Sequence, residues 1–89
     1  MDELTKDDFK DNGFRVYGTE QCSYCKKANK LLEQHSMKVN YTDINEDVEA
    51  KKYIVYDLQQ RTVPQIIGID NNGEEHHIGG YEELYALLK

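Results

Sequence analysis

The stretch Cys22-Ser23-Tyr24-Cys25 contains both cysteines of this 89-residue chain. Positions i and i+3 of a helix lie on one face, with Cβ atoms about 5–6 Å apart. A disulfide requires Cα atoms roughly 4.4–6.8 Å apart. The pair can therefore close into a disulfide and reopen without a rearrangement of the fold.

The flanking residues place this pair between a strand and a helix. Phe14-Arg15-Val16-Tyr17 is typical of a short strand, and residues 18–21 of a turn. After the cysteines, four residues have the spacing i, i+3, i+4 and i+7 of an amphipathic helix. They are Ala28, Leu31, Leu32 and His35.

The first cysteine thus stands at a helix N-terminus, where free N–H groups and the helix dipole favour a thiolate. Lys26 and Lys27 add positive charge one turn further on. We therefore expect Cys22 to be the low-pKa nucleophile. Cys25, inside the first turn and less exposed, is expected to be the resolving thiol.

Two other roles exist for a Cys-x-x-Cys pair, a zinc site and a pair of inert structural thiols. A structural zinc site needs four ligands, and only His35, His76 and His77 could complete one. Their spacing does not resemble a second cysteine pair, so no metal site is expected and the histidines are predicted to be ordinary helix or strand residues. The strand–turn–helix setting favours redox chemistry over both alternatives.

Length and charge limit the class of protein. Eighty-nine residues predict one small domain with a thin core. The net charge is −6, from 11 basic and 17 acidic residues, and without a basic patch it argues against a nucleic-acid partner. The sequence shows no leader pattern and no run of the ~20 apolar residues that a membrane span requires. A cytoplasmic location is expected, where a lone cysteine pair is more often catalytic than structural.

The chain divides into an acidic N-terminal arm, residues 1–13, and a domain, residues 14–89, with Asn12-Gly13 as the turn between them. Leu4 and Phe9 are isolated apolar residues in the arm, which either forms a short helix or stays loose. Hydrophobic patterning then predicts strands at residues 14–17, 38–44, 65–69 and 74–78 and helices at about 23–36, 46–58 and 81–88.

The order of these elements predicts the fold class. The first strand–helix–strand unit predicts a parallel pair, and Asn72-Gly73 predicts a hairpin between the last two strands. Asn45 is the predicted N-cap of the second helix. The order β-α-β-α-β-β-α predicts an α/β fold, a four-stranded mixed sheet flanked by three helices.

Two further features, the proline and the glycine pair, each have both a structural and a functional explanation. Pro64 can simply begin a strand, or it can form a cis Val63–Pro64 bond placed for function. Gly79-Gly80 can end a strand, or it can let a carboxylate ligand approach the N-terminus of the next helix. Tyr24, exposed between the cysteines, is predicted to contact substrate.

Four separated motifs together resemble those of glutaredoxins: Val16-Tyr17, Cys22-Ser23-Tyr24-Cys25, Thr62-Val63-Pro64-Gln65 and His77-Ile78-Gly79-Gly80-Tyr81. The resemblance covers residues 14–89 and implies a thioredoxin-like fold in which a cis Pro64 faces the cysteines. It implies glutathione as reductant, not tightly bound, in a groove lined by Tyr24, Thr62, Val63, Pro64, Gly80, Tyr81 and Glu82. It also implies that the Val63 backbone pairs with the cysteinyl part of glutathione and that the glycine pair and helix start hold its γ-glutamyl carboxylate.

The implied activity is reduction of protein disulfides and glutathione mixed disulfides by the Cys22/Cys25 dithiol of a monomer. Ribonucleotide reductase is the protein client that the resemblance suggests for this electron transport.

Two departures from the family pattern keep alternatives open. Thr19, beside Glu20, stands where many glutaredoxins have a lysine for the glycyl carboxylate, although Lys26, Lys27 or Arg61 could replace it. The replacement of the lysine by Thr19 favours a redoxin reduced by thioredoxin reductase. Ser23 replaces the usual proline of the cysteine motif, which keeps open a dimer that holds a [2Fe–2S] cluster through Cys22 of two chains and two glutathiones.

Overall fold

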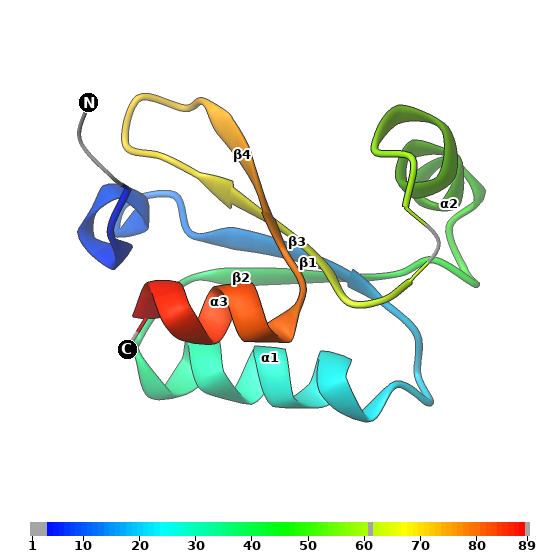
Figure 1. The fold of residues 1–89 in the computed structure, drawn as a ribbon, viewed down its shortest axis with the longest axis horizontal. Helices are drawn as coiled ribbons and strands as arrows, with labels where there is room; N and C mark the ends of the chain where they lie inside the picture. Colours follow the sequence, from blue (N-terminus) through cyan, green and yellow to red (C-terminus); the bar gives the residue numbers. More distant parts are fainter. Residues whose placement is uncertain (1–3, 61, 89) are drawn as a thin grey trace.

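The sheet and its helices are seen in a computed structural model that describes residues 4–60 and 62–88 (Figure 1). In chain order the elements are η1 (Lys6–Phe9), β1 (Phe14–Gly18), α1 (Ser23–Gln34), β2 (Val39–Asp43), α2 (Val48–Lys52), η2 (Tyr53–Asp57), β3 (Gln65–Ile69), β4 (Glu75–Gly79) and α3 (Tyr81–Leu88). The strands lie in the order β2-β1-β3-β4, with β1 parallel to β2 and the other neighbours antiparallel. The predicted α/β fold with a four-stranded mixed sheet is confirmed.

Strand pairing brings the cysteine motif and the proline motif to the same edge of the sheet. Tyr17, near the end of β1, pairs with Gln65, the first residue of β3. The chain that follows β1 and the chain that precedes β3 therefore meet at this edge, on the right in Figure 1, while η1 and the β3–β4 turn lie at the opposite end.

The core consists of two clusters because successive strand residues face opposite sides of a sheet. Val16 and Ile66 face α1 and α3, which lie together on one side of the sheet, and Tyr17 and Ile67 face α2 on the other. The larger cluster contains Phe9, Phe14, Val16, Ala28, Leu31, Leu32, Met37, Ile66, Leu84 and Leu88.

The second helix differs from its prediction. Asp47, not Asn45, is the N-cap, and its Oδ1 accepts the N–H of Ala50 at 3.1 Å. Asn45 instead donates its backbone N–H to Asp43 Oδ1 at 2.8 Å, which keeps it in the turn and delays the helix by two residues. The α-helix then gives way at Tyr53 to one π-helical segment, η2.

The N-terminal segment packs onto the sheet through Phe9. This residue has 0% of its surface exposed, and its ring centroid lies 5.0 Å from that of Phe14. The backbone N–H of Asn71 donates to Asp8 O at 2.9 Å, and that of Asp11 donates to Asn71 Oδ1 at 3.1 Å. The segment from η1 to Gly13 is therefore joined to the β3–β4 turn, and Phe9 belongs to the core.

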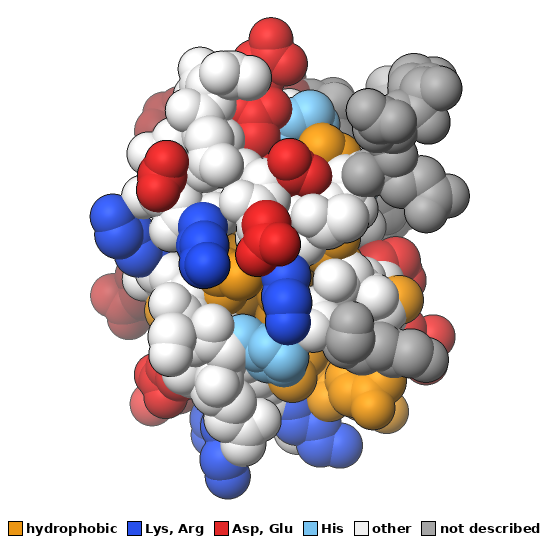
Figure 2. Space-filling view, turned by 90° about the vertical axis from the view of Figure 1, so that its left-hand side faces the viewer, with side chains coloured by type: hydrophobic (Ala, Val, Ile, Leu, Met, Phe, Trp, Pro, Cys, Tyr) orange, Lys and Arg blue, Asp and Glu red, His pale blue; other side chains and the backbone are white. Residues whose placement is uncertain are grey.

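Charged side chains of both signs are interspersed on the end of the molecule where η1 lies (Figure 2). One exposed pair near it is Arg15 with Glu75, whose N and O atoms are 2.7 Å apart. Such exposed pairs contribute little to stability. Among the described helices, none combines the length and the apolar character needed to cross a bilayer.

Candidate active site

The two cysteines lie at the start of α1. Cys22 is the N-cap residue and is partly exposed, whereas the Cys25 side chain is fully buried, as expected for the two members of the pair. Their Cα atoms are 5.2 Å apart and their sulfur atoms are paired as a disulfide. The spacing that the sequence predicts for a closing and reopening pair is thus present.

The surroundings of Cys22 favour negative charge on its sulfur. The backbone N–H of Cys25 donates to Cys22 Sγ at 3.1 Å. This sulfur also lies at the N-terminus of the 12-residue helix α1, where the helix dipole is positive. On its other side Cys22 Sγ lies 3.8 Å from the carbonyl oxygen of Val63. This sulfur therefore lies between a helix end that stabilises a thiolate and the backbone of the proline loop.

Cys25 is packed against the end of β1. A Cβ atom on Gly18 would lie 2.5 Å from Cys25 Sγ and 2.6 Å from the hydroxyl oxygen of Tyr41. The Tyr41 hydroxyl donates to Thr19 O at 2.8 Å, and burial raises the pKa of Tyr41, so it stays a neutral donor. The turn that leads to Cys22 is fixed by this contact.

The predicted binding residues come together in one open groove of about 550 Å³. The peptide bond between Val63 and Pro64 is cis, as the resemblance implies. All seven predicted residues line the groove: Tyr24, Thr62, Val63, Pro64, Gly80, Tyr81 and Glu82. Arg61, one of the cations suggested in place of the missing lysine, lies outside the described residues.

Aromatic rings form one rim of this groove. Tyr24 is 54% exposed, and its ring centroid lies 5.9 Å from that of Tyr81, which in turn lies 6.3 Å from that of Tyr85. The ammonium of Lys27 lies 5.0 Å from the centre of the Tyr24 ring. Lys27 therefore places a positive charge at the rim, within the usual range of a cation–π contact.

The N-terminus of α3 also lines the groove. Gly79 has a φ of +119°, a conformation that suits glycine, and the N–H of Gly80 donates to Glu83 Oε1 at 2.9 Å. The chain's own carboxylate thus occupies the helix start where a ligand carboxylate is expected. Sequence reasoning missed Glu83, although Glu three residues after the residue that precedes a helix, here Gly80, has the spacing of a capping box.

The two adjacent histidines of β4 have different surroundings. His77 lines the groove and bonds the Gln65 side chain, a contact that sequence reasoning also missed. His76 bonds Asp70 at the β3–β4 turn, with Nε2 and Oδ2 2.8 Å apart. Period-two alternation accounts for the difference, because neighbours in a strand face opposite sides.

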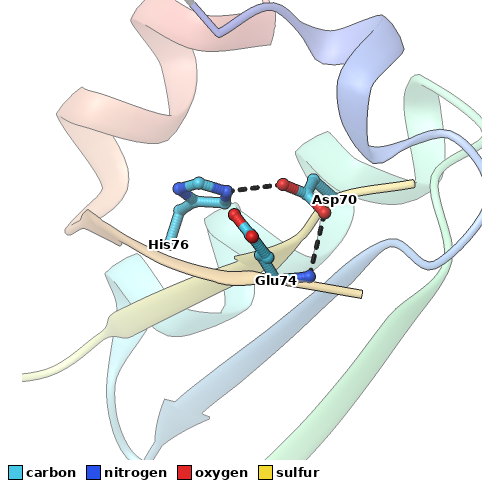
Figure 3. Close-up of side chains that lie close together, drawn as sticks. All are labelled: Asp70, Glu74 and His76. Carbon is cyan, nitrogen blue, oxygen red and sulfur yellow. Dashed lines mark hydrogen bonds and ion pairs between the residues drawn. The ribbon is translucent and has the colours of Figure 1, made fainter. Parts of the chain in front are cut away.

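Asp70, Glu74 and His76 form a cluster whose possible metal-binding atoms lie within 4.8 Å of one another (Figure 3). Asp70 Oδ1 accepts the backbone N–H groups of Asn72 and Glu74, both at 2.9 Å. The bond from His76, together with that from Glu74, holds the pKa of Asp70 below its ordinary value. These hydrogen bonds explain why the cluster forms: it stabilises the β3–β4 hairpin turn.

Comparisons with known proteins agree with this geometry. A family model described as Glutaredoxin matches residues 14–73. The chain is 33% identical over 72 residues to Glutaredoxin 3 of Escherichia coli K12, covering 81% of each chain. It is similar to the solution structure of glutaredoxin from Brucella melitensis, with a TM-score of 0.63 and 30% identity over 84% of this chain and 76% of that one. A buckwheat glutaredoxin–glutathione complex has a TM-score of 0.67 and 24% identity, covering 89% and 70%.

Proposed function

Because the chain belongs to the glutaredoxin family of thiol–disulfide oxidoreductases, we propose that it uses glutathione to reduce protein disulfides and glutathione mixed disulfides. The observation that carries this proposal is the groove beside Cys22. Its lining unites the residues for which the family resemblance implies glutathione contacts, and the Val63 carbonyl lies 3.8 Å from the reacting sulfur.

The reaction follows from the positions of the two thiols. The Cys22 thiolate attacks one sulfur of the client disulfide, which breaks and releases the other client sulfur as a thiolate. The Cys25 thiolate then attacks Cys22 Sγ, releases the reduced client and forms the Cys22–Cys25 disulfide. One glutathione opens this disulfide by bonding to Cys22, and a second removes the first as oxidised glutathione. Two glutathiones thus supply the two electrons that the client receives.

Charge in the groove bears on how glutathione binds. Glu82 and Glu83 are exposed at the start of α3, so a γ-glutamyl carboxylate bound there competes with Glu83 for the Gly80 N–H. The amino group of glutathione can then meet these carboxylates. Lys27, over the Tyr24 ring at the rim of the groove, is the cation that we assign to the glycyl carboxylate in place of the lysine absent at Thr19.

A second candidate reductant is thioredoxin reductase, and the residue that favours it is Thr19. Its carbonyl is engaged by Tyr41 at 2.8 Å, and its short side chain brings no positive charge to the groove. The buckwheat protein was solved with glutathione, but its identity to this chain supports the fold and not the residues of the groove. Ribonucleotide reductase as client, a monomeric state, a cytoplasmic location and the alternative [2Fe–2S] dimer stay predictions.

The proposal is tested by reducing a small mixed disulfide in two parallel reactions coupled to NADPH. One contains glutathione and glutathione reductase, and the other contains thioredoxin reductase without glutathione. We expect turnover in the first reaction only. Turnover in the second reaction only would overturn glutathione as the reductant and assign the chain to the redoxins.

A further inference from the structure

The side chain of Gln65 is buried directly behind the proline loop. It is 4% exposed, and its Nε2 donates to Thr62 O at 2.8 Å and lies 3.3 Å from Thr62 Oγ1. Its Oε1 lies 2.7 Å from His77 Nε2. Three polar contacts therefore converge on one buried amide.

The partners of this amide fix its orientation. A carbonyl oxygen only accepts, so the NH2 group of Gln65 must face Thr62 O and its Oε1 must face His77. His77 then carries a proton on Nε2 and donates it to Gln65. The two hydrogen bonds therefore donate in the same direction. The imidazole N–H of His77 donates to the Gln65 amide, which in turn donates to the Thr62 carbonyl.

Strand register explains why this histidine reaches the amide. His77 pairs with Ile67. Ile67 and Gln65 are two residues apart in β3, so their side chains point to the same face of the sheet. His76 lies on the other face, where its ring centroid is 5.9 Å from that of Phe9. Only the second of the two histidines can therefore act on the groove.

The residue that the amide holds is next to the substrate-binding backbone. Thr62 and Val63 lie outside the helices and strands, so no sheet ladder fixes them. The Thr62 carbonyl is the last main-chain group before Val63, whose own carbonyl faces Cys22 Sγ at 3.8 Å. A rotation of the Thr62–Val63 peptide would turn the Val63 backbone away from a substrate attached to Cys22.

We propose that Gln65 and His77 are positioning residues that hold the Val63 backbone in place to bind the main chain of a peptidic substrate such as glutathione. This inference rests on the proposed function and adds the part of the chain that prepares its binding site. The two side chains act through Thr62 and do not touch the reacting sulfur. Their loss is expected to affect binding of peptidic mixed disulfides and to spare attack on disulfides that have no peptide groups.

The test is single-turnover reaction of the reduced protein with two probes. One is a glutathionylated peptide, and the other is 5,5′-dithiobis(2-nitrobenzoate), a disulfide without peptide groups. For His77→Ala we expect the half-saturating concentration of the first probe to rise about threefold to tenfold, the effect of one hydrogen bond. The rate with the second probe is expected to stay within about twofold, less than a hydrogen bond is worth.

Two further variants sharpen the test. His77→Gln keeps an N–H donor and is expected to restore most of the binding, whereas Gln65→Glu replaces the donor that faces Thr62 O with an acceptor and is expected to lose more than His77→Ala. His76→Ala is the matched control, because it removes the neighbouring histidine of the same strand from the opposite face. It is expected to leave both probes unchanged.

The outcomes separate this inference from the proposed function. A wild-type protein that does not saturate with the glutathionylated peptide would contradict the glutathione groove itself. Saturation by the wild type, with equal losses on both probes for His77→Ala, would overturn the positioning role and leave the groove intact. A lower melting temperature without a change in either probe would overturn it as well. If Gln65→Glu does not fold, the two variants of the exposed residue His77, His77→Ala and His77→Gln, are sufficient to test the positioning role.

Discussion

The ring of Phe9 occupies the space that a side chain at Gly68 would need. A Cβ atom on Gly68 would lie 2.5 Å from Phe9 Cε1 and 2.8 Å from Cδ1. Glycine weakens a strand interior and often marks the close approach of another group, and here that group is a side chain from the N-terminal segment. The glycine of β3 is therefore part of the contact that joins η1 to the sheet.

We expect Phe9→Ala to lower the free energy of unfolding by about 3–5 kcal/mol, the usual cost of removing a buried phenylalanine. Urea denaturation of the reduced protein measures it. Leu4→Ala, which removes an exposed side chain from the same segment, is the control and is expected to stay near wild type. Equal stability of Phe9→Ala and wild type would contradict the packing of η1.

The same contact predicts that two substitutions are not additive. Gly68→Ala alone is expected to destabilise by about 1–3 kcal/mol, because the new methyl group overpacks the site. In a Phe9→Ala background the space is free, so Gly68→Ala is expected to be neutral or stabilising. A double-mutant cycle measures this coupling, and additive effects would show that the ring and the glycine do not meet.

The decrease of the free energy of unfolding at acidic pH is expected to depend on Asp70. Its pKa in the folded chain lies below the ordinary 3.8, so the unfolded chain binds the proton first as the pH falls. Its contribution is complete above about pH 5 and is lost as the pH falls through the ordinary value and then the lower folded-state value. Asp70→Asn should therefore be less stable near neutral pH, with a shallower loss in acid, when unfolding is followed by urea from roughly pH 2 to 7. Asp57→Asn, which removes a carboxylate from an exposed position, is the control for the loss of one negative charge.

Gly18→Ala is expected to disturb Cys25, the proposed resolving thiol. The added methyl group would meet Cys25 Sγ and the Tyr41 hydroxyl, and overpacking of this kind costs about 1–3 kcal/mol. Urea unfolding gives the loss of stability, and the rate at which Cys25 displaces a protein client from Cys22 gives the functional loss. Wild-type values for both would show that the turn adapts to the extra carbon.

The division of work between the thiols is tested by serine substitutions. Cys22→Ser is expected to abolish thiol transfer. Cys25→Ser is expected to spare reduction of glutathione mixed disulfides and to impair reduction of protein disulfides, because only the latter needs a second thiol. Assays with one substrate of each kind check this, and residual activity of Cys22→Ser would place the nucleophile elsewhere.

Glu83→Gln tests competition at the start of α3. The Glu83 carboxylate now accepts the Gly80 N–H, where we place the γ-glutamyl carboxylate of glutathione. A neutral amide repels that carboxylate less, so we expect the KM for glutathione to fall about twofold to fivefold, the scale of one charge at a helix N-terminus. A rise in KM would show that Glu83 assists glutathione binding.

The sequence predicts the features of the fold that depend on local patterns. Alternating and helical spacings locate the sheet and three helices, and the family motifs identify the seven residues of the groove. Phe9 was missed because its spacing of five from Leu4 matches neither period, and the glycine that makes room for its ring, Gly68, lies far along the chain. The role of Asp47 was missed because the Asp43 side chain decides which residue caps α2. The Gln65–His77 contact depends on the register between β3 and β4, which neither motif encodes.

The residues by which this chain resembles its relatives are not all the residues that it needs to fold. The family match covers residues 14–73, yet Phe9, Leu84 and Leu88 lie in the main hydrophobic cluster with 0% of their surfaces exposed. A fragment cut at the limits of this family match would keep both cysteines and the cis proline but would open the core at two places. Truncations and chimaeras of this protein should therefore be bounded by its packing and not by the extent of the family match.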